Sequence, residues 1–68
     1  MAGPHPAKAV LVMRRITARD LARAIGRDDF HLRKILNGRR RASPEVRRLV
    51  SEYLGLPERD LFHADESA

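Results

Sequence analysis

Apolar residues recur every three or four positions in successive segments of this chain, which is the spacing of one face of an α-helix. The clearest stripe runs from Val46 to Leu54. Shorter stripes occupy residues 7–15, 17–26 and 28–37, and a last short one follows the fourth. Strict alternation of apolar and polar residues, which would indicate a strand, is not found. The pattern therefore predicts an all-α fold, a compact bundle of five short helices.

The periodicity also predicts which side chains face the core. The expected inward-facing residues are Val10, Leu11, Met13, Leu21, Ala22, Ile25, Leu32, Ile35, Leu36, Val46, Leu49, Val50, Tyr53, Leu54, Leu61 and Phe62. Small Ala22 would allow a second helix to approach the helix over 17–26 closely.

Capping residues set the predicted ends of the helices. Thr17 is an N-cap, and Asp20 three residues later completes a variant of the capping box. Gly26 supplies the left-handed residue that stops that helix. Asp28 or Asp29 begins the next helix, and the pair Asn37-Gly38 ends it. The signal Ser43-Pro44-Glu45 starts the long fourth helix.

Length and composition indicate one small domain. We expect a flexible N-terminal arm over 1–6, a domain over 7–63 and an acidic tail over 64–68. The 68 residues contain no cysteine, which excludes disulfides and the common structural zinc sites. The three histidines are scattered along the chain, and those in the terminal segments suggest no role. We expect no metal, no cofactor and no small-molecule ligand.

Positive charge is concentrated in one part of the chain. The net charge is +5, with twelve Arg against two Lys. Arginine suits bidentate contact with phosphate and guanine, although a GC-rich genome would also favour arginine codons. Between Arg33 and Arg48 there are seven basic residues and one acid, whereas Glu58 onward holds four acids and one Arg. This segregation predicts one basic face, which is typical of a protein that binds nucleic acid.

Two classes of protein fit the sequence poorly. The longest apolar run, Ala9–Met13, is much shorter than a spanning helix and lacks the cleavage site of a signal peptide, so we expect a cytoplasmic protein. No paired-carboxylate cleft, nucleophile with a base, or Gly-rich phosphate loop is evident. Asp28 and Asp29 diverge on a helix and cannot act as a dyad, so an enzyme is not expected.

An ordered set of residues resembles the Cro/C1-type helix-turn-helix family of phage repressors and bacterial regulators. The matching residues are Ile16-Thr17, Asp20-Leu21-Ala22, Ile25-Gly26, Leu32, Ile35, Asn37-Gly38, Leu54-Gly55-Leu56-Pro57 and Asp60-Leu61-Phe62. The resemblance spans about residues 7–63. It implies that helices 2 and 3 form a helix-turn-helix and that the protein is a sequence-specific regulator of transcription, repressor-like, which binds double-stranded DNA. Such proteins usually act as homodimers on pseudo-palindromic operators.

The same resemblance assigns the contacts with DNA. It places a recognition helix at about 28–37 in the major groove, with base-reading residues Asp29, Phe30, His31, Arg33 and Lys34. Contacts with the DNA backbone would come from Thr17, Arg19, Asn37, Arg39, Arg40 and Arg41. Lys34 could equally contact phosphate, and Arg41 could enter a narrow minor groove.

Several positions depart from the family pattern. Asp28 caps its helix, but Asp29 would either accept from a cytosine amino group or be repelled by DNA. Phe30 would pack on a thymine methyl group or contact another protein. Ala18 stands where the family often has a phosphate-contacting Gln. An acidic helix with an exposed aromatic suits a protein groove, so the alternative is a protein-interaction module on the same fold, phage inhibitor or antitoxin-like, that uses Asp28, Asp29 and Phe30.

Two expectations concern packing. Many family members carry an Arg–Glu ion pair where this chain has Leu11 and Leu36, and we expect these leucines to touch. Replacing a buried ion pair by a packed apolar pair is often neutral or stabilising. A dimer surface is expected around Leu56, Leu61 and Phe62 on the last helix.

Overall fold

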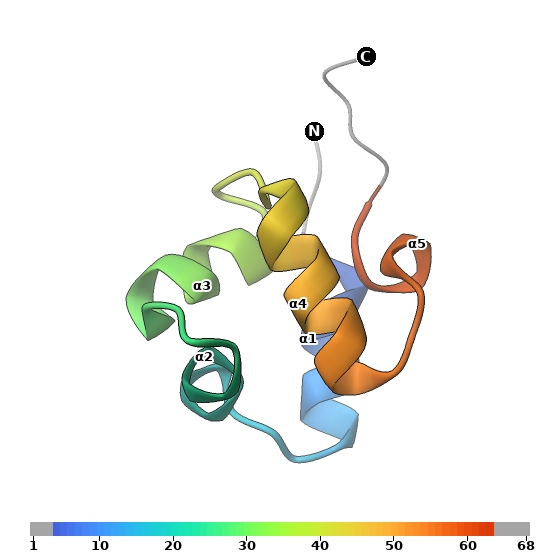
Figure 1. Ribbon diagram of the computed structural model, residues 1–68, viewed down its shortest axis with the longest axis horizontal. Helices are drawn as coiled ribbons and strands as arrows, with labels where there is room; N and C mark the ends of the chain where they lie inside the picture. The colour runs from blue at the N-terminus through green and yellow to red at the C-terminus, as the bar shows by residue number, and fades with distance from the viewer. Residues whose placement is uncertain (1–3, 64–68) are drawn as a thin grey trace.

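The computed structural model describes residues 4–63, which form five α-helices and no strand. The helices are α1 (Pro6–Met13), α2 (Ala18–Ile25), α3 (Asp29–Leu36), α4 (Pro44–Leu54) and α5 (Glu58–Leu61). In Figure 1, α2 and α3 lie on one side of α4, and α5 lies on the other side. The predicted all-α bundle of five short helices is confirmed. The expected acidic tail, 64–68, lies outside the described residues.

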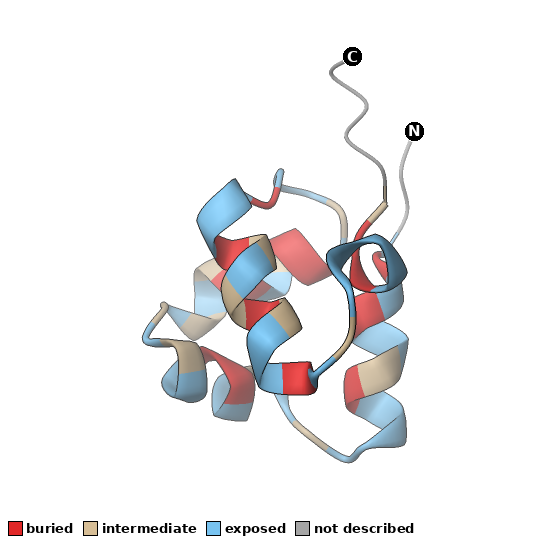
Figure 2. Ribbon diagram, turned by 45° about the vertical axis from the view of Figure 1, so that its right-hand side comes forward, coloured by how far each residue is buried: buried red, intermediate tan, exposed pale blue. Residues whose placement is uncertain are grey.

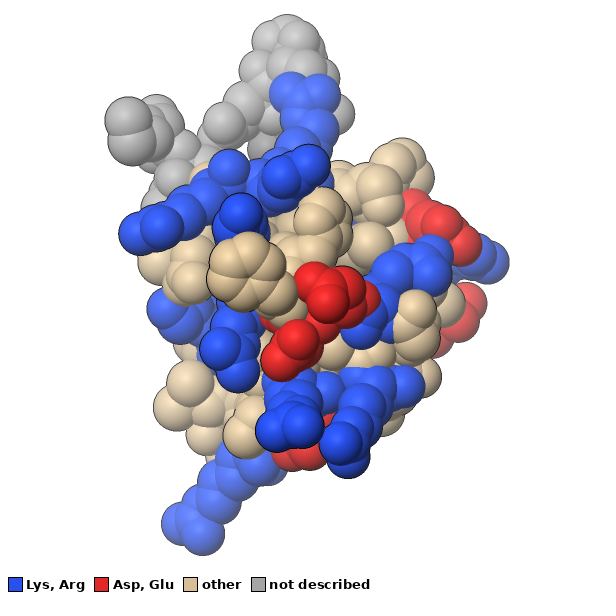
Figure 3. All heavy atoms as spheres, turned by 90° about the vertical axis from the view of Figure 1, so that its left-hand side faces the viewer, with Lys and Arg blue, Asp and Glu red and all other residues tan. Residues whose placement is uncertain are grey.

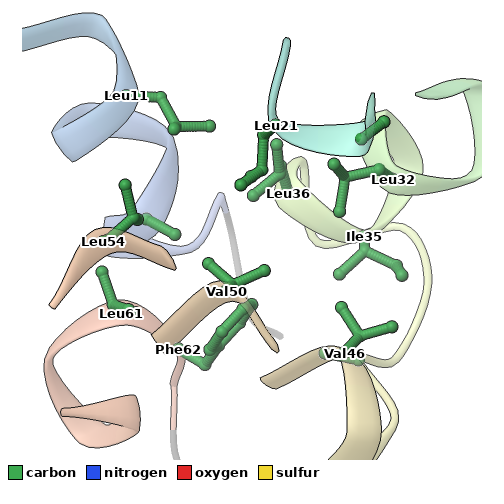
Figure 4. Close-up of a cluster of buried hydrophobic side chains, with 13 residues drawn as sticks. Leu11, Leu21, Leu32, Ile35, Leu36, Val46, Val50, Leu54, Leu61 and Phe62 are labelled. Atoms are coloured by element: carbon green, nitrogen blue, oxygen red, sulfur yellow. The ribbon is translucent and has the colours of Figure 1, made fainter. Parts of the chain in front are cut away.

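All five helices contribute to one hydrophobic core. The buried apolar residues are Ala7, Leu11, Leu21, Ala22, Leu32, Ile35, Leu36, Ala42, Val46, Val50, Leu54, Leu61 and Phe62. Figure 2 shows that the buried positions face the interior of the bundle on each helix, as the helical spacing predicts. In Figure 4, Val50 of α4 lies between the leucines of α2 and α3 and the Phe62 ring.

Two of the predicted inward-facing residues are wrong. Met13 is 82% exposed and Tyr53 is 47% exposed. Met13 lies two residues after buried Leu11, which turns it by about 200° to the opposite side of α1. Tyr53 lies in the last turn of α4, where neighbouring helices leave half of its side chain uncovered.

The last helix faces inward and does not present the predicted dimer surface. Leu61 and Phe62 are 0% and 2% exposed, and Leu56 is partly buried. Helix α5 packs against α1 and α4. The expected dimer surface is therefore wrong for Leu61 and Phe62, since both are already covered within one chain.

The N-terminal segment packs on the domain over residues 4–6, which belong to the stretch expected to be an arm. Pro6 begins α1, and His5 is buried. The His5 N–H donates to the Leu36 carbonyl at 3.0 Å, at the end of α3. Residues 1–3 of the expected arm lie outside the described residues.

His5 also connects the two ends of the described chain. The His63 N–H donates to His5 Nδ1 at 3.0 Å, and the His5 ring meets the Phe62 ring edge-on at 5.2 Å. The His63 Nε2 atom lies 2.9 Å from the Pro4 carbonyl oxygen. These contacts hold Pro4 and His5 beside Phe62 and His63, a role that the sequence did not suggest for either histidine.

The helix starts follow the predicted capping chemistry. The Thr17 hydroxyl accepts from the Asp20 N–H at 3.0 Å, and the Asp20 carboxylate accepts from the Thr17 N–H at 3.4 Å, which completes the capping box. An Asp28 oxygen accepts from the His31 N–H at 2.8 Å. The starts of α2 and α3 are therefore fixed by local hydrogen bonds, and the Asp28 cap fixes where the turn between the two helices ends.

A left-handed residue follows each of the four longer helices. These residues are Arg15 after α1, Gly26 after α2, Gly38 after α3 and Gly55 after α4. In three of the turns the amides of this residue and of the next donate to carbonyls of the last helical turn, which is the Schellman arrangement. Gly26 thus ends α2 as predicted and turns the chain directly into α3.

Candidate nucleic-acid interface

Helix α3 buries one side and exposes the other. Leu32, Ile35 and Leu36 are each at most 3% exposed. The residues between them face outward to different degrees. Phe30 is 64% exposed, and the Arg33 side chain is 58% exposed. The outer side of α3 therefore offers an aromatic ring and a guanidinium group to a partner.

Two side-chain pairs, each four residues apart, run along this outer side. Arg33 Nη2 lies 3.8 Å from Asp29 Oδ2, and Lys34 Nζ lies 4.7 Å from the centre of the Phe30 ring. Exposed pairs of this kind contribute little to stability, about 0–1 kcal/mol. Arg33 and Lys34 are therefore held loosely and remain available to a partner with a stronger charge. The Asp29 carboxylate is half-buried beside the Arg33 guanidinium and is therefore not an isolated negative charge.

The start of α2 lies beside the end of α3. Thr17 and Ala18 line one recess together with Arg33 and Asn37. The first turn of a helix has N–H groups without intrahelical partners, and capping satisfies that of Asp20. Because Thr17 and Ala18 share this recess with Arg33, the positive end of the α2 dipole lies next to the outer side of α3.

Three arginines from α2 and from the turn that follows it lie near the start of α3. Arg19, Arg23 and Arg27 line a polar recess of about 240 Å³ together with Asp28 and Asp29. Arg27 Nη2 also pairs with Glu45 Oε1 at 2.7 Å. The negative charges of Asp28 and Asp29 at the start of α3 therefore have three arginines as neighbours.

The segment after α3 adds further positive charge. Asn37 is exposed and its side-chain oxygen accepts from Lys8 Nζ. Gly38 has a φ of 79°, and the exposed residues Arg39, Arg40 and Arg41 follow it. Figure 3 shows this side of the molecule with acidic side chains near its centre and Lys and Arg side chains around them.

The structure brings most of the predicted site residues to this side. Thr17 and Arg19 of α2 lie next to α3, and Asn37 lies at its end. His31 is only half-exposed, and its backbone N–H serves the cap of α3. Sequence reasoning missed Arg23 and Lys8. The i, i+4 spacing of Arg19 and Arg23 was a signal for the first, whereas Lys8 is brought to Asn37 only by the packing of α1.

Comparison with known proteins adds no assignment, because no family model, curated protein or solved structure matches this chain. Two classes of feature are also missing from residues 4–63. No helix there is long and apolar enough to cross a membrane. No group of three or more His, Asp or Glu side chains in that range is placed to hold a metal ion.

Proposed function

We propose that this protein is a sequence-specific regulator of transcription, repressor-like and cytoplasmic, that lays α3 in the major groove of double-stranded DNA. The observation that carries this proposal is the exposed side of α3. It presents Arg33 to a partner and is flanked by cations of α2 and of the Arg39–Arg41 segment. A helix of this kind fits a groove lined by phosphates, because cations on both sides meet the two strands.

Individual contacts follow from this placement. Arg33 reads the O6 and N7 atoms of guanine, and the Asp29 carboxylate beside it accepts from the amino group of a cytosine. Lys34, which lies over the Phe30 ring, contacts either guanine or a phosphate. Arg39, Arg40 and Arg41 bind phosphates and orient the protein without reading sequence.

The active species in this proposal is a homodimer on a pseudo-palindromic operator. Half-sites would lie one helical turn apart, about 10 base pairs. Since Leu61 and Phe62 are buried, the dimer contacts come from other residues. The large exposed hydrophobic side chains within residues 4–63 that are not on α3 are Val12, Met13 and Tyr53.

The test is a selection of bound sequences from a random duplex library with the purified chain at moderate salt. We expect a palindromic motif with half-sites about one turn apart. Arg33→Ala is expected to lose preference at one base pair of each half-site, worth about 1–3 kcal/mol. Arg59→Ala on α5, away from this face, should return the unchanged motif. Recovery of only a salt-sensitive background would contradict sequence-specific binding.

One observation favours a second candidate, a protein-interaction module. Phe30 is 64% exposed and lies beside Asp28 and Asp29, a combination that suits a groove on a partner protein. A photo-crosslinking residue at position 30 separates the two functions in cells. Crosslinks to DNA support the regulator, whereas crosslinks to one protein, with no motif from the library, support this alternative.

A further inference from the structure

A recess of about 320 Å³ opens between α1, the start of α2 and the end of α3. Its floor is apolar and consists of side chains from three parts of the chain. Leu11 and Leu36 are each 3% exposed, and Ile16 and Ala18 pack partly buried against the core. The volume lies at the lower end of the range for small-molecule sites, about 300–1,000 Å³.

The rim of this recess carries positive charge. Lys8 and Arg33 both line it, and no acidic residue does. The Lys8 ammonium has three N–H donors and gives one to the Asn37 side chain. One guanidinium nitrogen of Arg33, Nη2, lies 3.8 Å from Asp29 Oδ2. Most of the five N–H donors of Arg33 therefore remain for another acceptor. An anion at the rim would therefore meet two cations with donors to spare.

We propose that this recess binds a small monocarboxylate with an apolar body, of about the size of phenylacetate. The apolar body would cover the floor formed by Leu11, Ala18 and Leu36, and the carboxylate would accept hydrogen bonds from Lys8 and Arg33. Charge-assisted hydrogen bonds of this type are stronger than neutral ones. Charge complementarity selects this class of ligand over a neutral hydrocarbon, which would gain nothing from the two cations at the rim.

Binding of such a ligand would oppose binding of DNA. Arg33 lines the recess, and the proposed function places it against guanine. Thr17 and Asn37 also line it, and the family resemblance assigns both to the DNA backbone. A carboxylate that engages Arg33 competes with guanine or phosphate for the same guanidinium group. Reciprocity then requires that DNA weaken the ligand by the same factor as the ligand weakens DNA. This coupling rests on the proposed function, whereas ligand binding does not.

The test of the site uses the full chain without DNA, ¹⁵N-labelled and titrated by NMR. Phenylacetate is expected to shift the amides of Leu11, Ala18 and Leu36 in a saturable way. Phenylacetamide, which has the same body without the charge, should bind about tenfold more weakly. Acetate, which lacks the apolar body, should cause no saturable shift at these amides. Equal binding of acid and amide, or shifts scattered over surface arginines, would overturn the proposal.

Two variants and one control localise the effect. Ala18→Leu fills the floor and is expected to abolish the saturable shifts. Lys8→Gln, at an exposed position, should weaken phenylacetate about tenfold while leaving phenylacetamide unchanged. Arg48→Gln, an exposed cation of α4 outside the recess, should titrate as the parent does. Unchanged affinity for phenylacetate in Lys8→Gln would overturn the assignment, even if Ala18→Leu failed to fold.

The coupling has its own readout. With a duplex recovered from the library selection, saturating phenylacetate should raise the apparent Kd for DNA, and the factor should match the loss of phenylacetate affinity on DNA. No change in the Kd for DNA would overturn the competition. If the library yields no motif, the proposed function fails, while the titration without DNA still decides whether the recess binds a carboxylate.

Discussion

Arg15 is the one non-glycine residue with a positive φ among residues 4–63. It has a φ of 58° at the end of α1, in the left-handed position that Gly26, Gly38 and Gly55 occupy after the other helices. A side chain in this conformation costs about 1–2 kcal/mol because its Cβ lies close to the neighbouring carbonyl oxygen. Arg15 tolerates it because the amide of Ile16 closes the turn on the Leu11 carbonyl at 2.9 Å.

Replacement of Arg15 by glycine should stabilise the protein. Glycine removes the strain but adds entropy to the unfolded chain, so we expect Arg15→Gly to raise the free energy of unfolding by about 0.5–1 kcal/mol. Urea denaturation measures the change. Gly26→Ala and Gly55→Ala are the matched controls, since an added Cβ meets open space at both positions and only the φ of 72° is penalised. These should lose about 1 kcal/mol. A loss of stability in Arg15→Gly would show that the side chain contributes more than the strain costs.

Helix α3 combines two tasks on opposite sides. Leu32, Ile35 and Leu36 attach it to the core, and the position of its outer residues depends on that attachment. Leu36 takes part in three structural features. Its carbonyl accepts from the His5 N–H, its side chain joins the core, and it lines the same recess as Leu11. Figure 4 shows Leu11 and Leu36 in one cluster, with Leu21 beside Leu36. Direct contact between the two leucines stays a prediction.

Truncation of Leu36 should therefore destabilise the whole domain. We expect Leu36→Ala to cost about 2–5 kcal/mol, because it removes buried apolar area and enlarges the recess. A thermal melt followed by circular dichroism measures the loss. Phe30→Ala on the exposed side of the same helix is the control and should change stability by no more than about 0.5 kcal/mol. A melt of Leu36→Ala close to that of the parent would remove Leu36 from the core assignment.

At the scale of the whole molecule, cations from several elements gather on the side that carries α3 (Figure 3). Arg19 and Arg23 come from α2, Arg33 from α3, and further arginines from the following segment. Long-range attraction between such a face and DNA depends on salt, because each neutralised phosphate releases counterions. This property belongs to the assembled face and not to any single side chain.

The salt dependence of DNA binding is the prediction at this scale. Replacing Arg39, Arg40 and Arg41 together by Ala should reduce the slope of log K against log salt by up to about three units, if each binds one phosphate. The slope is measured by fluorescence anisotropy over a range of salt concentrations. Arg59→Ala, on α5, should leave it unchanged. A triple variant with the parent slope would show that this segment does not contact phosphate.

The sequence by itself determined the helices and their ends, because these depend on local interactions. The helical spacing marked Leu32, Ile35 and Leu36 as buried, and Thr17 and Gly26 marked the ends of α2 through contacts within a few residues. The exposed side of α3 was predictable for the same reason. Whether these residues bind DNA stays a prediction.

Only the tertiary structure decided what depends on residues far apart in the chain. The burial of His5 requires Phe62 and His63, and the exposure of Met13 follows from the direction in which Leu11 packs. The recess needs α1, α2 and α3 to meet, and its rim joins Lys8 to Asn37 across 29 residues. Periodicity fixes the side of a helix that is buried, but packing against other helices fixes which surfaces adjoin, and that is where the candidate sites lie.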